Sequence, residues 1–349
     1  MEENRILASI IIPMKNEESY IGRCLDSVLA NDFPRNQYEI LVVDGNSTDG
    51  SRDAVASRMC GSPGIRLLEN PAGIVSTAMN TGIRQSRGTY IIRMDAHSEY
   101  PSNYIRTCIG ELERTGAECV GGCAVTKAGA HTTVAEAIAW ITQHPVGVGN
   151  SAYRLGHGDR FVDTVPFGTF RKSLFDRIGM YRENLVRNQD YELNTRIRQG
   201  GGRIYLSSKT YVLYYNVPTF PKFMAQAYSN GAYVALMWLR NPASFCWRHG
   251  APFFLVAGLL GGLALGTFSG AARAILASLL AVYLLGILWA SLQISFRRGR
   301  KYFLVLPGLF LSCHLVYGLG TMLGLMRHPF LQRAASRVPP RSTRLSRMP

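Results

Sequence analysis

The second part of the sequence contains no acidic residue. All 23 Asp and Glu residues lie at or before Glu192, whereas Lys and Arg continue to the end of the chain. Residues 1–192 carry 20 basic residues, for a net charge of −3, and residues 193–349 carry 18 basic residues, for a net charge of +18. This asymmetry indicates two parts of different kinds rather than one evenly charged soluble domain.

Two common phosphate-binding patterns are also missing. No G-x-G-x-x-G follows the first predicted strand, and no G-x-x-x-x-G-K-[ST] occurs anywhere in the chain. The glycine-rich stretch 147–158 has no clear strand before it, so we expect it to be a loop. These absences exclude an ordinary dinucleotide-binding or P-loop site.

Cysteines spaced for a zinc or redox site are absent as well. No two of the seven cysteines form a C-x-x-C pair, and Cys119 and Cys123 have no second ligand pair nearby. Such an odd set predicts reduced thiols in a cytoplasmic domain. The N-terminal MEENRILAS is acidic and predicts no secretory signal peptide.

Long apolar runs are what the second part does contain. The runs 252–268, 275–296 and 302–326 include no Lys, Arg, Asp or Glu. A bilayer core about 30 Å thick needs roughly 20 apolar residues in a helix. The second and third runs meet that length, and the first is marginal. We therefore expect two or three transmembrane segments within 251–326, with buried core helices as the alternative.

Basic residues predict how these segments are oriented. Arg240, Arg248 and the cluster 297–301 flank a hairpin of the first two runs, which places both ends in the cytoplasm at a bacterial inner membrane. The tail, 327–349, holds six arginines and no acid, which favours contact with anionic lipid rather than with nucleic acid. Three full spans would put this tail outside. Either one run is not a simple span, for example because Pro307-Gly308 turns it back, or the rule fails here.

The first part alternates short β-branched apolar runs with helical patterns. The predicted strands are 7–14, 38–44, 65–70 and 89–95, and the predicted helices are 17–30, 48–59 and 73–88. This alternation predicts an α/β domain with a mostly parallel central sheet, in which ligands lie at the carboxyl ends of the strands. Three polar stretches follow such ends and should converge on one crevice, namely 13–17, 44–46 and 95–97.

Asp95 and His97 suggest a metal site in this crevice. An acid-lined crevice would repel a bare diphosphate unless a cation lay between them. The two side chains alternate about a strand end and can therefore face the same side. Mg²⁺ prefers oxygen ligands, and Mn²⁺ also accepts imidazole. The alternative is that Asp95 caps the following turn and that His97 is solvated.

Four motifs in order resemble family 2 glycosyltransferases of the GT-A fold. They are SIIIPMKNEESYIGRCLDSVL, YEILVVDGNSTDGS, NPAGIVSTAMNTGIRQSRGTYIIRMDAHSEYPSNYI and PFGTFRKSLFDRIGMYRENLVRNQDYELNTRIRQGGGRIYL. The resemblance covers about residues 6–216. Within the family, the sequence is most similar to the membrane-attached glucosyltransferases of succinoglycan-type exopolysaccharide synthesis.

The resemblance implies a role for each matching position. It implies a nucleotide pocket formed by Pro13, Asn16, Glu17, Asp44, Asn46, Asp49, Asn80 and Arg84. It implies that Asp95 and His97 bind the metal, that Asp190 is the general base, and that Phe167, Gly168 and Thr169 form the loop under the donor sugar and acceptor. From the residues alone, Asp190 could equally be a helix N-cap.

The sequence departs from the family pattern at three points. Gly45 stands where a second acid is frequent, and His97 replaces the second acid of the D-x-D motif. Because His ligates a metal only when neutral, metal binding should weaken as pH falls, and the preference should shift from Mg²⁺ towards Mn²⁺. The Q-x-x-R-W motif of processive synthases is absent, since Gln226-Ala227-Tyr228-Ser229 stands there, so we expect transfer of one sugar per acceptor.

These observations lead to one expected function. The chain would be a membrane-bound inverting glycosyltransferase that uses a UDP-sugar, with UDP-glucose implied by the resemblance, and an undecaprenyl-diphosphate-linked saccharide as acceptor. Membrane lipids and other polysaccharide-assembly proteins are expected partners. Transfer to a polyprenyl monophosphate and a non-catalytic nucleotide-binding scaffold remain alternatives. The expected segments are a catalytic domain at 1–216, an interfacial amphipathic segment or plain linker at 217–250, the membrane region at 251–326, and the cytoplasmic tail at 327–349.

Overall fold

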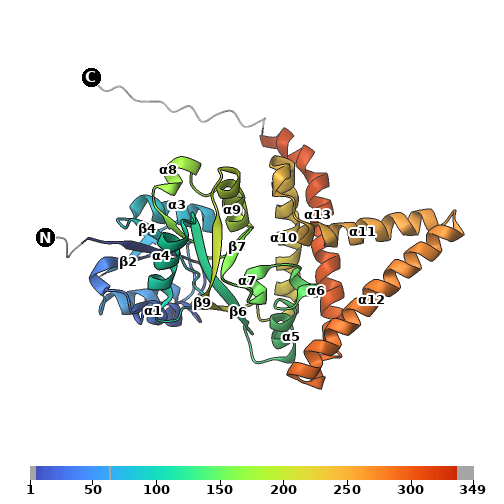
Figure 1. The fold of residues 1–349 in the computed structure, drawn as a ribbon, viewed down its shortest axis with the longest axis horizontal. Coiled ribbons are helices and arrows are strands. Elements are labelled where there is room, and N and C mark those ends of the chain that lie inside the picture. Colours follow the sequence, from blue (N-terminus) through green and yellow to red (C-terminus); the bar gives the residue numbers. More distant parts are fainter. Residues whose placement is uncertain (1–4, 63, 336–349) are drawn as a thin grey trace.

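The computed structural model describes residues 5–62 and 64–335. Figure 1 shows an α/β domain on one side and four long helices on the other. The expected basic tail, 327–349, lies outside the described residues from position 336 onward.

The first four strands form the parallel half of one sheet, in the order β3-β2-β1-β4. They are β1 (Ala8–Met14), β2 (Tyr38–Asp44), β3 (Ile65–Glu69) and β4 (Tyr90–Arg93), joined by α1 (Ile21–Leu29), α2 (Ser51–Met59) and α3 (Val75–Gln85). Alternate residues of a strand face opposite sides. Ile10 and Ile12 of β1 accordingly pack with α1 and α4 (Tyr104–Thr115), whereas Ile11 packs with α3. This half agrees with the predicted alternation of strands and helices.

The remaining strands make the sheet mixed rather than simply parallel. They are β5 (Ser98–Glu99), β6 (Cys119–Lys127), β7 (Arg160–Val162), β8 (Thr169–Arg171) and β9 (Ile204–Tyr215). β8 is antiparallel to β4 and β6, while β6 and β9 run parallel. β5 and β7 are antiparallel to β9, so this half of the sheet contains strands of both directions.

Short helices surround the far end of the sheet. They are α5 (Thr133–Ile141), α6 (Pro145–Val148), α7 (Ala152–Leu155), α8 (Leu174–Ile178) and α9 (Gln189–Gln199). The stretch 147–158, expected to be a loop, therefore includes the end of α6 and all of α7. Its glycines Gly149 and Gly156 have positive φ angles and end these two helices, because glycine adopts that conformation without a Cβ clash.

Four long helices form the second part of the molecule. They are α10 (Phe220–Arg240), α11 (Trp247–Gly266), α12 (Gly270–Arg298) and α13 (Leu306–Ala335). Among the described residues, three helices are long and apolar enough to cross a membrane, over Trp247–Gly266, Gly270–Arg298 and Leu306–Arg327. The third run does not turn back at Pro307, which lies in the first turn of α13. Proline is tolerated there because the N–H groups of the first turn have no partner within the helix.

Close contact between α10 and α13 depends on small residues. The two helices lie side by side (Figure 1), with Gly320 of α13 against the Tyr228 carbonyl and Gly324 against Ala232. A Cβ at Gly324 would lie 2.8 Å from the Ala232 oxygen, closer than the atoms can pack. This G-x-x-x-G spacing lets the two backbones approach. The segment 217–250 is thus mainly a helix bound along its length to α13.

Candidate active site

A cleft of about 120 Å³ lies at the carboxyl ends of β1 and β4. Pro13, Glu17, Asp95 and His97, all predicted site residues, line it, together with Lys15. Gly45 and Gly73 form part of its floor. A Cβ at Gly45 would lie 3.2 Å from Gly73 Cα and 3.3 Å from the Met14 oxygen, so a side chain at this position, where the family often has an acid, would be tightly packed.

His97 joins two acidic side chains in this cleft. Its Nδ1 lies 2.9 Å from Asp95 Oδ1 and 2.9 Å from Glu17 Oε1. Burial favours the neutral ring, but Asp95 and Glu17 raise the pKa of His97 well above its ordinary value. The backbone N–H of His97 also donates a hydrogen bond to Asp95 Oδ1, at 3.3 Å. Asp95 therefore caps the turn, as the alternative interpretation proposed, and still presents its carboxylate to the cleft.

The donor atoms of Asp95 and His97 suit a divalent cation that also binds substrate. The described residues, 5–62 and 64–335, contain no group of three or more His, Cys, Asp or Glu side chains that could hold a metal ion alone. Mg²⁺ and Mn²⁺ at phosphate sites usually take one or two protein ligands and complete their shell with phosphate and water. A carboxylate and an imidazole on one side of the cleft fit this pattern.

The other predicted nucleotide contacts hold the walls of the cleft together. Asp44 is fully buried and accepts hydrogen bonds from Ser47 Oγ at 2.6 Å and Arg52 Nη1 at 2.7 Å. Burial raises the pKa of the Asp49 carboxyl, but the hydrogen bonds that it accepts from Ser51 and from the Glu18 backbone N–H together lower this pKa below its ordinary value. The contact between Asp49 and Glu18 ties the loop after β2 to the loop after β1.

Asn16 and Asn46 occupy the turns of these two loops. Both have positive φ angles, 56° and 61°, a conformation that Asn tolerates better than most residues. Asn16 Oδ1 accepts from the Thr48 backbone at 2.8 Å, and Asn46 Nδ2 donates to the Pro71 oxygen at 3.2 Å. Neither side chain is among the residues that line the cleft, and their proposed contact with a nucleotide stays a prediction.

Asn80 and Arg84 lie on α3, away from the cleft lining. The Asn80 amide binds the Tyr181 oxygen at 2.8 Å and Glu183 Oε1 at 2.9 Å. Arg84 Nη2 lies 3.8 Å from Glu183. In the described structure both side chains therefore position the segment 181–183, which leads to α9, and their proposed contact with a nucleotide stays a prediction.

Asp190 lies at a second, larger cavity. It stands in the first turn of α9, whose N-cap is Asn188, so the alternative role of Asp190 as N-cap is wrong. Asp190 forms an ion pair with Arg93 Nη1. Burial raises the pKa of the Asp190 carboxyl, and Arg93 opposes that rise. A carboxylate of raised basicity is what general-base chemistry requires.

The predicted loop of Phe167, Gly168 and Thr169 contacts Arg93, the partner of Asp190 in this ion pair. The Arg93 backbone donates to the Gly168 oxygen at 3.0 Å, and the Arg93 guanidinium lies 5.6 Å from the centre of the Phe167 ring. Thr169 begins β8 beside Ile92. Phe167 lines the larger cavity. The predicted loop is thus next to Asp190 and Arg93.

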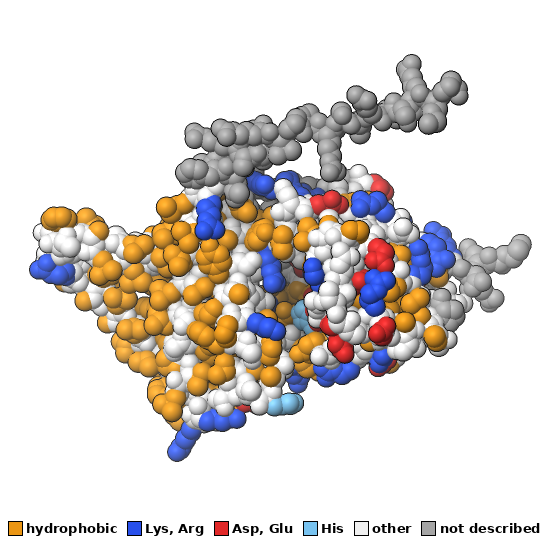
Figure 2. All heavy atoms as spheres, turned by 180° about the vertical axis from the view of Figure 1, so that it is seen from behind, with side chains coloured by type: hydrophobic (Ala, Val, Ile, Leu, Met, Phe, Trp, Pro, Cys, Tyr) orange, Lys and Arg blue, Asp and Glu red, His pale blue; other side chains and the backbone are white. Residues whose placement is uncertain are grey.

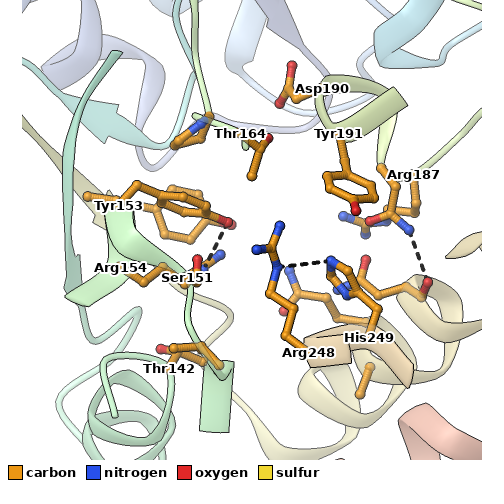
Figure 3. A pocket seen from close by; sticks show the side chains of 18 of the residues that line it. Thr142, Ser151, Tyr153, Arg154, Thr164, Arg187, Asp190, Tyr191, Arg248 and His249 are labelled. Atoms are coloured by element: carbon orange, nitrogen blue, oxygen red, sulfur yellow. Dashed lines mark hydrogen bonds between the residues drawn. The ribbon is translucent and has the colours of Figure 1, made fainter. Parts of the chain in front are cut away.

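The larger cavity joins the catalytic domain to the long helices. Its volume is about 330 Å³, and Arg93 and Asp95 line both this cavity and the smaller cleft. Figure 3 shows Asp190 and Tyr153 from the domain facing Arg248 and His249 from the start of α11. The two spaces are therefore neighbours, with the side chains of Arg93 and Asp95 between them.

Sequence reasoning missed five Lys and Arg residues at these sites. Lys15 lines the cleft, Arg93 lines both spaces, and the larger cavity is also lined by Arg154, Arg187 and Arg248. Arg93 could have been noticed, because it precedes Asp95 by two residues and so faces the same side of β4. Nothing in the sequence shows that Arg154 and Arg248, 94 positions apart, meet at one cavity.

The fold and the site together define a class of protein. A curled mixed sheet whose strand ends carry Asp95 and His97, followed by three candidate membrane helices, is a GT-A-like transferase domain attached to a membrane-helix region. Residues 9–179 match the model of Glycosyl transferase family 2. The chain carries a family 2 glycosyltransferase domain, as its motifs suggested.

Relatives extend this likeness over different lengths. The chain is 30% identical over 208 residues to the succinoglycan biosynthesis protein ExoA of Rhizobium meliloti, a match that covers 59% of this chain and 62% of that protein, less than two thirds of its length. It is 26% identical to a dolichyl N-acetyl-alpha-D-glucosaminyl phosphate 3-beta-D-2,3-diacetamido-2,3-dideoxy-beta-D-glucuronosyltransferase of Methanococcus voltae, over 91% of this chain and 97% of that protein.

One solved structure shares the fold over most of the chain. It is the mannosyltransferase PcManGT from Pyrobaculum calidifontis, in complex with GDP-Man and Mn²⁺. The two align with a TM-score of 0.60 at 18% identity, over 90% of this chain and 87% of that one. The likeness confirms the architecture, including a helical part after the catalytic domain.

Proposed function

We propose that the chain is an inverting, metal-dependent glycosyltransferase that transfers one sugar from a UDP-sugar, UDP-glucose first among them, to an undecaprenyl-diphosphate-linked saccharide in exopolysaccharide assembly. The observation that carries this proposal is that Arg93 and Asp95 line both the cleft and the larger cavity. A donor bound at the ends of β1 and β4 would therefore be next to an acceptor bound beside Asp190. The name of the dolichyl phosphate relative supports a lipid-borne acceptor, and that of the succinoglycan relative supports a role in exopolysaccharide assembly.

The side chains suggest how the transfer proceeds. A divalent cation on Asp95 and His97 would neutralise charge on the leaving diphosphate. Asp190 would take the proton of the acceptor hydroxyl as that oxygen attacks the anomeric carbon and the nucleoside diphosphate leaves. Arg93 holds the Asp190 carboxylate in place through their ion pair. One base and one displacement invert the anomeric centre.

The larger cavity favours an extended acceptor over a bare phosphate. Its volume of about 330 Å³ is of the size that binds a small molecule rather than a single ion. A saccharide can thus extend from Asp190 towards α11, with its lipid carrier at the helices.

A transfer assay tests the proposal. Purified full-length protein would be given UDP-, GDP- and TDP-sugars with Mn²⁺, and either undecaprenyl-diphosphate-linked saccharide or undecaprenyl monophosphate. We expect UDP release and a product lengthened by one sugar on the diphosphate-linked saccharide. If product formed only on undecaprenyl monophosphate, the acceptor would be a polyprenyl monophosphate instead of a diphosphate-linked saccharide. Nucleotide binding without any sugar transfer would favour a non-catalytic scaffold.

We also infer that α11 and α12 are the membrane-crossing elements and that α10 and α13 lie along the inner membrane surface, with the catalytic domain cytoplasmic. The hairpin of α11 and α12 projects away from the catalytic domain (Figure 1), and its tip residue Phe268 is 92% exposed. In Figure 2 apolar side chains cover this helical part, while acidic and basic side chains gather on the other. At about 1.5 Å per residue, the 20 residues of α11 span roughly the 30 Å of a bilayer core.

The packing of α13 explains why it need not cross. Leu306 and Phe310 are fully buried against Ile138 and Ile141 of α5 on the catalytic domain. Further along, the glycines of α13 contact α10. With two crossings rather than three, the arginine-rich tail stays on the same side as the catalytic domain. This arrangement satisfies the charge rule that three spans would break.

Epitope accessibility tests this topology in the full-length chain. Tags would be inserted after Phe268, after Gly299 and at the C-terminus, with a control tag after the exposed Cys60 of the catalytic domain. In intact spheroplasts we expect only the tag after Phe268 to be cleaved by added protease. Cleavage of the C-terminal tag from that side would show that α13 spans the membrane.

A further inference from the structure

Arginines gather where the larger cavity approaches the membrane helices. Arg154 comes from α7 of the catalytic domain, and Arg248 from the first turn of α11. Figure 3 shows Arg248 reaching into the cavity opposite Tyr153 and Arg154, with Asp190 at the far side. Two guanidinium groups from separate parts of the fold thus face one space.

The two arginines differ in how their charge is balanced. Arg248 Nη2 lies 2.5 Å from Asp163, and its side chain is 6% exposed. Arg154 has no carboxylate at ion-pair distance among residues 5–62 and 64–335. Its contacts are aromatic: Nε donates to Tyr153 Oη at 3.3 Å, and the guanidinium lies 5.3 Å from the Tyr153 ring and 6.0 Å from the Tyr214 ring.

A charge in such surroundings indicates an anionic ligand. Removing a guanidinium from water is costly unless an anion or acceptors compensate for the lost hydration. The two arginines also act on a shared neighbour: burial alone would raise the pKa of the Tyr153 hydroxyl, yet Arg154 and Arg248 lower it. Arginine presents paired N–H donors that match phosphate oxygens.

The position of Arg154 and Arg248 indicates which molecule carries the anion. Arg248 is the second residue of α11, the helix we place in the bilayer, so the cavity wall at this point lies at headgroup level. Donor diphosphate belongs at the other end, beside Lys15, Asp95 and His97. A phosphate bound at Arg154 and Arg248 would instead belong to a lipid whose attached sugar points towards Asp190.

We propose that Arg154 and Arg248 bind the phosphate of the lipid-linked acceptor and so set the distance between the acceptor sugar and Asp190. This rests on the proposed transfer to a lipid-linked saccharide. The ligand class is a polyprenyl phosphate or diphosphate ester. Neither group touches the reacting atoms, so both act as binding and positioning residues.

Transfer kinetics with two acceptors test this assignment. For Arg154→Gln we expect KM for the undecaprenyl-diphosphate-linked saccharide to rise about 10- to 100-fold, as loss of a charge-assisted contact implies, with partial recovery in Arg154→Lys. KM for the same saccharide on an uncharged alkyl chain should not change. Arg160→Gln is the matched control, because Arg160 is exposed and binds only the His157 oxygen, at 3.0 Å, among the contacts described.

A binding measurement separates this inference from the proposed function. Thermal unfolding of detergent-solubilised protein would be followed with bare undecaprenyl monophosphate and with anionic phospholipid. We expect the prenyl phosphate to stabilise the wild type and Arg160→Gln but not Arg154→Gln, even if no sugar transfer occurs. An equal rise in KM of Arg154→Gln for the charged and the uncharged acceptor would overturn the assignment. So would stabilisation of Arg154→Gln by undecaprenyl monophosphate to the same extent as the wild type. Equal stabilisation by phospholipid would reduce it to a general lipid contact, which also contradicts the proposal.

Arg248 needs a paired variant because Asp163 would otherwise be left without its partner. Arg248→Gln combined with Asp163→Asn removes both charges of the 2.5 Å ion pair. We expect this double variant to unfold near the wild-type temperature and to show the same acceptor-selective rise in KM. A normal KM for the diphosphate-linked acceptor would remove Arg248 from the site.

Discussion

Asp190→Asn should lower kcat for sugar transfer by about 10²- to 10⁴-fold, the range expected when a general base is lost. The amide has nearly the shape of the carboxylate and can still accept a hydrogen bond from Arg93, but it cannot take a proton. Because Asp190 lines the larger cavity and not the donor cleft, binding of the UDP-sugar should change little. Steady-state kinetics and calorimetric titration with UDP measure the two effects.

A matched acid and a paired variant make this result specific. Asp53 lies exposed in the first turn of α2, and Asp53→Asn should leave kcat unchanged. Asp190→Asn also weakens the partner of a buried guanidinium, so a loss of activity could reflect misfolding. Arg93→Met with Asp190→Asn removes both charges and should recover thermal stability without recovering turnover. Turnover by Asp190→Asn within a few-fold of wild type would show that another group is the base.

Strand ends were the most predictable part of the site. In an alternation with helices, short β-branched runs such as 38–44 are typical of buried parallel strands. The polar residues that follow such strands lie at the same edge of the sheet. Asp95, His97 and Glu17 indeed lie within one cleft. Local sequence sufficed here because the strand period fixes which side chains share a face.

The larger cavity was not predictable, since its walls come from segments far apart in the chain. Arg154 on α7 and Arg248 on α11 line one cavity, and α11 is held there by contacts between distant segments, such as Pro252 against Gly318 of α13 and Arg248 against Gly149. The periodicity of a single sequence indicates its helices and strands, but it does not show how the long helices pack against the catalytic domain. The same limit applies to α13: its apolar composition indicates a span, while its packing on α5 shows that the catalytic domain covers part of it.

Asp95→Asn should abolish the dependence of nucleotide binding on a divalent cation. We expect Mn²⁺ to tighten UDP binding by the wild type at least about tenfold, which corresponds to roughly 1.4 kcal/mol, and to have little effect on the variant. The substitution is nearly isosteric, and the backbone contact of Asp95 with Tyr100 Oη, at 2.7 Å, does not involve the exchanged atoms. Titration calorimetry with UDP in Mn²⁺ and in EDTA measures the difference.

The control for this experiment is a carboxylate outside the cleft. Asp26 on α1 pairs with Arg58 at 2.9 Å, and Asp26→Asn should retain the full effect of Mn²⁺. His97→Gln should fall between Asp95→Asn and the wild type, because an amide oxygen can replace one neutral ligand but not the imidazole's affinity for Mn²⁺. If Asp95→Asn still bound UDP more tightly with Mn²⁺ than with EDTA, by the wild-type factor, the cation would have to be held elsewhere. The role of the acid and the imidazole in the cleft would then be confined to the turn that Asp95 caps.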